Sequence, residues 1–354
     1  MSDVENAEVE GFDPTIFSHV FQLSTNRETG LTTAFFFAFN TTITLSALAP
    51  EAHCATVFKE IREECRRYER LFSRHIPESD IARLNAARGD EVEIDAETYA
   101  LLQASRHYCA MSGGVFDISV GPALQLWDFA RGVIPEAAKL ARSTSHIDWR
   151  MLQVRNEAAE EGDSPDEGLR SNALEGVDGR HGHSPRYYAR LTDPEGVIDV
   201  GGIAKGYIAD KLAARLDACS IQNYVINLGG NVVVKGRRPD GEHWKVGIQD
   251  PRRARPALRA IEVVDASAVT SGTCERSFTK NGVLYHHILD PKTGRPVDTD
   301  VAGVTVVAAR SLDAEGYSTT LLALGIEKGC SFVRERNEII AAYFVDKEGV
   351  VTEA

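Results

Sequence analysis

The chain of 354 residues is long enough for one large or two modest domains, and 43% of its residues are hydrophobic, which allows a sizeable buried core. Its formal net charge is -13 at pH 7. Nucleic-acid binding depends on Lys and Arg neutralising phosphates, so this charge argues against general affinity for DNA or RNA.

The first residues of the chain are acidic and do not read as an export signal. Such a signal needs a basic start, an apolar run and a small-residue cleavage site, whereas this sequence begins MSDVENAEVEGFDP. We therefore expect residues 1–30 to be a flexible extension and the protein to be cytoplasmic, or extracytoplasmic if a signal has been cut away.

The next stretch, residues 34–49, is apolar but too short for a membrane helix, which needs roughly 20 apolar residues. Its alternating Phe39, Thr41 and Ile43 predict a β-strand. The six cysteines of the chain are scattered without zinc-type spacing, so we expect reduced, structural thiols.

Three helices follow in the N-terminal half. Apolar residues recur at helical spacing over residues 51–72. A short helix at residues 80–86 has Ser79 as its expected N-cap, and a third helix covers residues 96–111 before a Ser-Gly-Gly stop.

Residues 156–186 are rich in Glu, Gly, Asp, Ser and Pro and lack apolar periodicity, so we expect a mobile polar insertion. Beyond it, strands and helices alternate. The expected elements are a helix at residues 204–216, paired strands within 223–236 and 243–250, a strand at 301–309 and a helix at 314–324. No repeat or Pro-rich linker divides the chain, which predicts a single mixed α+β unit with two lobes over residues 31–354.

Paired glycines leave a strand and precede a helix in DVGGIAKGYIADKLAARL, residues 199–216. Backbone amides at a helix N-terminus carry partial positive charge, so Lys205 beside them could hold a pyrophosphate oxygen. The segment is neither a P-loop nor a GxGxxG fingerprint, and a tight turn with an exposed lysine explains it equally well. The glycines of NLGGNVVVKG, residues 227–236, interrupt a strand pattern and indicate a bulge or a close approach of backbone to ligand, or else a purely structural kink.

His287 lies just before DPKTGRP, a turn signature. A neutral imidazole held there could accept a proton from an attacking hydroxyl, in which case activity would fall on acidification. From the residues alone, a structural histidine that bonds to the turn is the favoured interpretation.

Glu315 and Thr319 lie four residues apart and therefore share one helical face. A carboxylate and a hydroxyl oxygen suit magnesium, which binds few protein oxygens and completes its octahedron with phosphates and water. Without further evidence, an ordinary surface pair would be the simpler interpretation.

Together these segments resemble the FAD:protein FMN transferases, a family also known as thiamine-biosynthesis lipoproteins. The resemblance runs from about residue 40 to about residue 329, and the matches occur in the order of the family. They are FSRHIPESDIARLN, GGVFDISVGPALQLWDF, DVGGIAKGYIAD, NLGGNVVVKG with Trp244, SGTCERSF, HILDPKTGRPV and STTLLALG. Each match alone is weak, but their combination is specific.

The resemblance implies a magnesium ion that bridges the FAD pyrophosphate, with Glu315, Thr319 and the carbonyl of Gly202 as its ligands. The family usually has Asp where this chain has Glu315, and we do not expect Asp313 to substitute because it points to another helical face. It also implies a cleft between the lobes in which FAD lies against Phe39, Ser73, Phe116, Asp117, Lys205, His287 and Ile288, with Asn85 in the loop of Ser73. Where many relatives have Met-Gly-Thr beside the flavin, this chain has Phe39-Asn40-Thr41.

The implied reaction is magnesium-dependent transfer of FMN from FAD to a Thr or Ser hydroxyl of an acceptor flavoprotein, with release of AMP. Lys205 would neutralise the pyrophosphate and His287 would orient or deprotonate the acceptor. The acceptor would be an FMN-binding domain with a motif like Asp-x-x-(Ser/Thr)-Gly-Ala-(Thr/Ser). The alternatives are an FAD pyrophosphatase, in which water replaces the acceptor, and a non-catalytic FAD-binding protein; a redox flavoenzyme is disfavoured because the dinucleotide fingerprints are missing.

Overall fold

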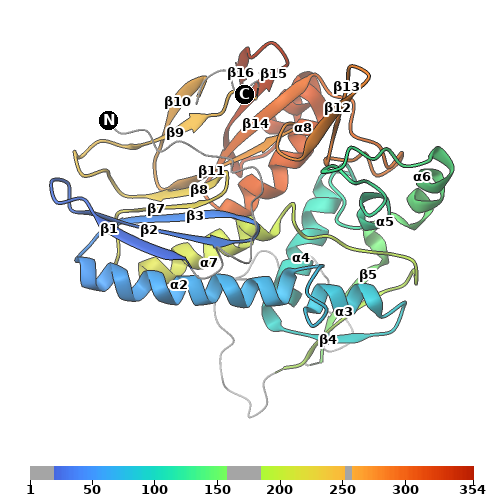
Figure 1. Cartoon of the computed structure of the whole chain (residues 1–354), viewed down its shortest axis with the longest axis horizontal. Helices are drawn as coiled ribbons and strands as arrows, with labels where there is room; N and C mark the ends of the chain where they lie inside the picture. The colour runs from blue at the N-terminus through green and yellow to red at the C-terminus, as the bar shows by residue number, and fades with distance from the viewer. Residues whose placement is uncertain (1–19, 158–184, 252–256) are drawn as a thin grey trace.

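The computed structural model describes residues 20–157, 185–251 and 257–354 (Figure 1). Its centre is a nine-stranded sheet in which each neighbouring pair of strands is antiparallel. From one edge to the other, the strands are β1 (Phe21–Thr25), β2 (Leu31–Ala38), β3 (Thr41–Leu48), β7 (Tyr224–Leu228), β8 (Asn231–Lys235), β11 (Ala266–Gly272), β14 (Val301–Ala308), β15 (Ile339–Asp346) and β16 (Val351–Glu353).

Three long helices pack on one face of this sheet (Figure 1). They are α2 (Glu51–Phe72), α7 (Ala204–Ala218) and α8 (Ser311–Arg334). Their apolar faces and the sheet enclose the main hydrophobic core. On the opposite face lies a two-stranded sheet of β9 (Trp244–Ile248) and β10 (Arg259–Val263), which covers a second, smaller core.

The remaining elements form the right-hand part of Figure 1. They are α3 (Asp80–Ala86), β4 (Val92–Ile94), α4 (Ala96–Met111), α5 (Gly121–Leu124), α6 (Ala137–Ser143), the 3₁₀ turns η1 (Thr144–His146) and η2 (Trp149–Met151), β5 (Leu152–Asn156), β6 (Tyr187–Leu191), β12 (Ser277–Lys280) and β13 (Val283–His286). Strands β4, β6 and β5 make a three-stranded sheet, and β12 pairs with β13 in a hairpin. The mixed α+β class expected from the sequence is confirmed.

The predicted helices are largely confirmed. Helices α2, α3 and α4 have the expected bounds, and the Ser79 hydroxyl caps α3 by accepting the N–H of Ala82 at 3.0 Å. Helix α8 begins earlier than expected, at Ser311. The expected end at residue 324 coincides with a break at Gly325, whose φ of 80° and ψ of 175° are not helical, and a second helical segment continues to Arg334.

The single strand expected within residues 34–49 is wrong, because the chain reverses there. Strands β2 and β3 pair in a hairpin whose two turn residues, Phe39 and Asn40, both have positive φ (54° and 59°). Positive φ at both central residues is the requirement of a type I′ turn. The Phe39 N–H donates to Glu69 Oε1 at 2.7 Å, which ties this turn to α2.

Two boundaries of the expected domain also change. Strand β1 pairs with β2, so the N-terminal extension cannot reach residue 30; residues 1–19 lie outside the described part. The polar insertion begins later than residue 156 and ends before residue 186, because Asn156 belongs to β5 and the Glu157 N–H donates to the Arg186 carbonyl at 2.9 Å. Its remainder, residues 158–184, lies outside the described part as well.

The segment 243–250 does not pair with the strands of 223–236 as expected. Strand β8 already has β7 on one side and β11 on the other, so neither of its edges is free. Strand β9 instead pairs with β10 and packs above the sheet. Among the described helices, none is both long enough and apolar enough to cross a membrane.

Candidate active site

Helices α7 and α8 touch at their first turns. A Cβ atom added at Gly206 would lie 2.6 Å from Glu315 Cβ and 2.7 Å from the Ser311 carbonyl oxygen, so only glycine allows this approach. One turn further along α7, the Asp210 carboxylate accepts the backbone N–H groups of Ser311 and Leu312 at 2.7 and 3.0 Å. These are N–H groups that the start of a helix leaves without intrahelical partners. Asp210 therefore caps α8 and fixes it against α7.

Glu315 places a buried carboxylate at this contact. Its side chain is 7% exposed, and its Oε1 lies 3.8 Å from Lys205 Nζ at the start of α7. Its Oε2 accepts a hydrogen bond of 2.6 Å from Asn231 Nδ2. A buried carboxylate needs such partners because burial removes its hydration. The structure thus brings Lys205 close to Glu315, and their roles toward FAD and a cation remain predictions.

The other two expected cation ligands are on neighbouring segments. Thr319 follows Glu315 by one helical turn and is half-buried, and its hydroxyl makes no hydrogen bond to any described residue. Gly202 lies in the turn just before α7, where an added Cβ atom would be 3.3 Å from the Phe116 ring. A carboxylate, a hydroxyl and a carbonyl are the hard oxygen donors that magnesium takes. The described ranges contain no group of three or more His, Cys, Asp or Glu side chains that could hold a metal ion.

The turn before α7 is fastened to the loop that follows α2. The Asn85 side chain makes two hydrogen bonds with the backbone of Ile198, at 2.8 and 2.9 Å. The Arg74 guanidinium lies 3.1 Å from an Asp199 carboxylate oxygen, and the Ser73 carbonyl accepts the hydroxyl of Ser79. Ser73 therefore lies in a loop that is held against the glycine turn. Asn85 belongs to helix α3 and not, as expected, to the loop of Ser73. The contact of both residues with FAD remains a prediction.

Asp117 uses its side chain inside its own loop. One carboxylate oxygen accepts the N–H and the hydroxyl of Ser119 at 2.8 and 2.6 Å, and the other accepts the Trp149 N–H at 3.3 Å. Burial raises the pKa of Asp117, and these hydrogen bonds oppose that rise. The side chain thereby shapes the segment that carries Phe116, and its expected contact with FAD is not tested by these bonds.

His287 follows β13 directly, and its backbone N–H donates to the Arg276 carbonyl at 3.1 Å. Its Nδ1 is buried and has no hydrogen-bond partner among the residues that the structure describes. The pKa of His287 is lowered to about 3, chiefly by burial and also by the positive charges of Arg276, His286 and Lys205. The adjacent Ile288 is buried, and its carbonyl accepts the Val297 N–H across the DPKTGRP turn at 3.0 Å.

The two glycines of NLGGNVVVKG form the turn between β7 and β8. Both have positive φ, 68° at Gly229 and 93° at Gly230, so they make a two-residue hairpin turn and not a bulge. An added Cβ at Gly229 would lie 2.3 Å from the Thr41 hydroxyl oxygen. The turn that carries Phe39 therefore lies against the turn that precedes Asn231.

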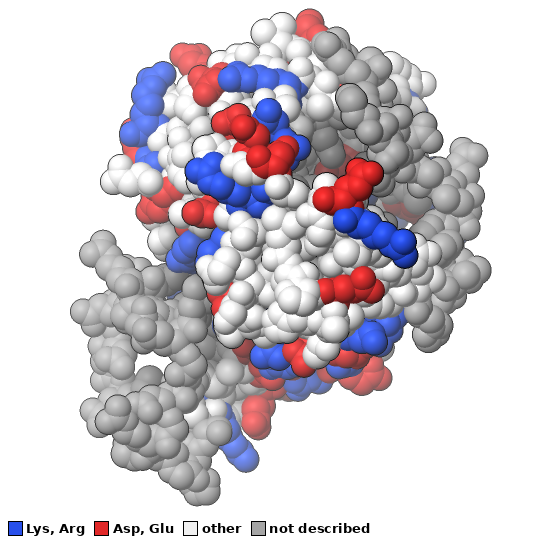
Figure 2. Space-filling view, turned by 90° about the vertical axis from the view of Figure 1, so that its left-hand side faces the viewer, with Lys and Arg blue, Asp and Glu red and all other residues white. Residues whose placement is uncertain are grey.

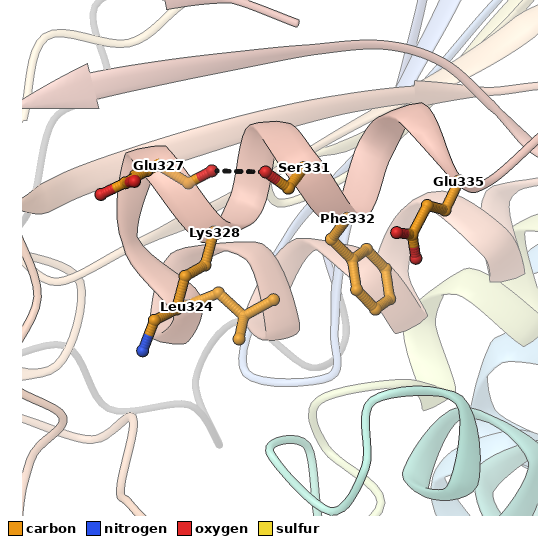
Figure 3. A pocket seen from close by; sticks show the side chains of 6 residues that line it. All are labelled: Leu324, Glu327, Lys328, Ser331, Phe332 and Glu335. Carbon is orange, nitrogen blue, oxygen red and sulfur yellow. Dashed lines mark hydrogen bonds between the residues drawn. The ribbon is translucent and has the colours of Figure 1, made fainter.

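A shallow pocket of about 310 Å³ lies elsewhere, on the C-terminal half of α8 (Figure 3). It is lined by Leu324, Glu327, Lys328, Ser331, Phe332 and Glu335. None of the expected site residues lines it, so we do not assign the chemistry to it. On the face shown in Figure 2, acidic and basic side chains are interspersed without a broad patch of one sign among the described residues.

A model of the ApbE family matches residues 39–344. The chain belongs to this family. It is 33% identical to a FAD:protein FMN transferase of Treponema pallidum, over 84% of this chain and 79% of that protein. A FAD:protein FMN transferase of Klebsiella pneumoniae is 30% identical over 85% of this chain and 84% of its own length.

Solved ApbE structures share the fold. The apo form of Pseudomonas stutzeri flavinyl transferase ApbE superposes with a TM-score of 0.72 at 26% identity, covering 94% of this chain and 95% of its own. The ApbE protein of Thermotoga maritima gives 0.75 at 24% identity, covering 94% and 97%. The flavin-transferase-like fold expected from the sequence is confirmed.

Sequence reasoning missed two residues that hold the expected site residues in place. Asp210 has the appearance of an ordinary polar residue of an amphipathic helix, and only its long-range contact with α8 distinguishes it. Asn231 had a local signal: it is a polar residue that begins a run of valines directly after a two-glycine turn, and it is fully buried. A buried amide in such a strand needs polar partners.

Proposed function

We propose that this protein is a magnesium-dependent FAD:protein FMN transferase. It would move FMN from FAD to a Thr or Ser hydroxyl of an acceptor flavoprotein and release AMP. The observation that carries the proposal is the meeting of Lys205 and Glu315 where α7 begins beside α8, in a member of a family whose relatives are named for this activity.

The residues fit a hard divalent cation. Glu315 offers a buried carboxylate, Thr319 an uncommitted hydroxyl one turn later, and Gly202 a carbonyl in the adjoining turn. When bound, magnesium would neutralise charge on the FAD pyrophosphate. The extra methylene of Glu315, relative to the aspartate usual in the family, is accommodated because its carboxylate is held by Asn231.

Lys205 supplies a second positive charge at the same point. Its Nζ is near Glu315 but not in close contact with it, at 3.8 Å from Oε1, and its side chain is 27% exposed. We place one pyrophosphate oxygen against this ammonium group and the N-terminal amides of α7. Transfer then forms a bond from the acceptor oxygen to the FMN-side phosphorus and breaks that phosphorus–oxygen bond to AMP. Such a reaction depends chiefly on positioning and charge neutralisation.

His287 faces this region with a neutral ring. A group with a pKa near 3 is a weak base, so its first role here is to accept a hydrogen bond from the acceptor hydroxyl and orient it. The unpaired, buried Nδ1 shows that the ring has hydrogen-bonding capacity that the described residues do not use. The hydroxyl proton would pass to this ring or to solvent as the phosphorus–oxygen bond forms.

The proposed acceptor is an FMN-binding domain with a motif like Asp-x-x-(Ser/Thr)-Gly-Ala-(Thr/Ser). This chain has no complete motif of that type, so its own modification is not expected. We propose further that FAD lies along the surface formed by the glycine turn before α7, the β2–β3 turn and the segment after β13, with the transferase domain beginning at β1.

The test is incubation of such an acceptor domain with this protein, FAD and magnesium, followed by intact mass and by an AMP assay. A covalent gain of one FMN with matching AMP would establish the transferase. AMP without modified acceptor would indicate the pyrophosphatase, and bound FAD without either product would indicate a binding protein.

A further inference from the structure

We infer that Asn231 is a positioning residue that fixes the direction of the Glu315 carboxylate for its cation. The inference rests on the proposed function, because it takes Glu315 to be a cation ligand. It adds a residue from β8, a strand to which the expected ligands do not belong.

The hydrogen bonds around Asn231 set which end of its amide faces Glu315. The Ser311 hydroxyl donates to Asn231 Oδ1 at 2.9 Å, and Asn231 Nδ2 donates to Glu315 Oε2 at 2.6 Å. An ionised carboxylate can only accept, so the amide nitrogen is the atom that suits Glu315. The opposite orientation would place two acceptor oxygens against each other. The network therefore assigns the orientation of the Asn231 side chain.

This network is closed to water. Asn231 is 0% exposed and Ser311 is 1% exposed. The Ser311 hydroxyl lies 3.1 Å from that of Ser267, which is also fully buried, on β11. Since these groups come from β8, α8 and β11, the amide is fixed by the packing of the sheet against the helix.

The amide also divides the two carboxylate oxygens of Glu315 between different partners. Oε2 is held by Asn231, which leaves Oε1 as the oxygen that faces Lys205. A glutamate has one more rotatable bond than an aspartate, and an unheld carboxylate would lose that freedom only on binding a cation. By fixing the carboxylate in advance, Asn231 offsets this loss, which is the usual effect of a hydrogen-bond partner on a metal ligand.

The test measures cation binding directly. Mn²⁺ is titrated into the full-length protein with FAD and no acceptor, and free Mn²⁺ is followed by electron paramagnetic resonance. Asn231→Ala should raise the Mn²⁺ dissociation constant by about 10- to 100-fold. The matched control is Asn223→Ala, which removes a side-chain acceptor of the Arg237 N–H at the far end of the same hairpin and should leave Mn²⁺ binding within about twofold.

A wild-type Mn²⁺ dissociation constant in folded Asn231→Ala would overturn the inference. If the alanine variant does not fold, Asn231→Leu retains most of the side-chain volume and is held to the same criterion. A second arm uses Glu315→Asp, whose shorter side chain withdraws the carboxylate from the amide. In the Glu315→Asp background, Asn231→Ala should change the Mn²⁺ dissociation constant by less than about twofold. If Asn231→Ala instead raises this constant as much as it does in the wild-type protein, the effects of the two substitutions are additive and Asn231 is a merely structural residue.

The Mn²⁺ titrations also distinguish failure of the proposed function from failure of the proposed role of Asn231. If the wild-type protein binds no Mn²⁺, or binds it equally well after Glu315→Gln, the metal assignment itself is wrong. If wild type binds Mn²⁺ through Glu315 and the Asn231 variants do too, only the positioning role is wrong.

Discussion

Gly206 of α7 and Glu315 of α8 approach so closely that a Cβ atom at residue 206 would lie 2.6 Å from the Cβ atom of Glu315. This contact sets the distance between the first turn of α7, which carries Lys205, and the carboxylate of Glu315. The first prediction follows from it. Gly206→Ala should lower the free energy of unfolding by about 1–3 kcal/mol through overpacking and should also weaken FAD cleavage, because the helices must move apart.

Chemical denaturation and an AMP assay measure the two effects. The control is Gly303→Ala in β14, where the nearest neighbour of an added Cβ atom is 3.6 Å away. If the two variants lose the same free energy of unfolding and release AMP at the same rate, the close contact between Gly206 and Glu315 does not have the proposed role.

A second prediction concerns the cap on α8. Burial raises the pKa of Asp210 from 3.8 to about 6, while its hydrogen bonds to Leu312 and Ser311 oppose the rise. The folded protein therefore holds a proton that the unfolded chain releases between pH 4 and 6, so the contribution of Asp210 to stability falls as pH rises through that window. Asp210→Asn should remove this slope while keeping one acceptor for the α8 amides. Thermal unfolding measured from pH 4 to 7 would show an unchanged slope if Asp210 is not the group responsible.

The third prediction concerns His287. Because its pKa is lowered to about 3, the ring stays neutral from pH 8 down to pH 5, and activity should show no inflection from this group in that range. The unfolded chain binds a proton near pH 6.5, so the stability contributed by neutral His287 is complete above pH 6.5 and is lost as pH falls towards 3. This slope is opposite in sign to that of Asp210.

His287→Gln should reduce the transfer rate by about 10²-fold or more if the ring orients the acceptor hydroxyl. His286→Gln is the matched control, since His286 is the adjacent buried histidine with its Nδ1 also unpaired. A transferase rate that is unchanged in His287→Gln, measured by intact mass of the acceptor, would remove His287 from the mechanism.

A fourth prediction separates two acidic residues on α8. Glu315→Gln should raise the magnesium concentration needed for half-maximal activity by at least about tenfold, because it removes the charged ligand. Asp313→Asn should not, since Asp313 accepts the Tyr108 hydroxyl at 2.5 Å on another face of the helix. Magnesium titrations of both variants measure this concentration. If it rises in Asp313→Asn and not in Glu315→Gln, Asp313 is the acidic ligand of the cation and Glu315 is not.

The fifth prediction concerns the lysine at the start of α7. Lys205→Met should weaken FAD binding by about tenfold to a hundredfold, the effect of losing a charged hydrogen-bond donor to a phosphate. Lys211→Met, which removes a lysine paired with Glu97 at 3.4 Å, is the control on the same helix. Fluorescence titration of FAD gives both dissociation constants, and similar values would place the pyrophosphate elsewhere.

Local sequence patterns predicted the features that depend on residues close together in the chain, such as helix bounds and helix caps. The helix at residues 51–72 has an apolar face at helical spacing, and Ser79 has the side chain that helix starts prefer, so both were found with correct bounds. The β2–β3 turn was missed because Phe39 gives no local indication of positive φ. Strand β9 was given the wrong partner because pairing depends on which edges the whole sheet leaves free.

In the candidate site, too, local spacing could be predicted from the sequence, whereas long-range contacts could not. Glu315 and Thr319 are one turn apart, and that spacing could be seen in the sequence. The hydrogen bond from Asn231 to Glu315 joins residues 84 positions apart, and no local pattern encodes it. The family resemblance gave the expected ligand positions, whereas the residues that hold Glu315 and α8 in place became visible only in the packing.

The antiparallel sheet has a consequence for synthesis of the chain. Lys205 and Asn231 leave the ribosome long before Glu315, and α8 packs against β11 and β14. A nascent chain that ends before residue 311 would carry the first turn of α7, with Lys205, but not its acidic partner. The proposed cation site therefore cannot form until Glu315 has been synthesised, and the proposed FAD cleavage would be restricted to chains that extend past this residue.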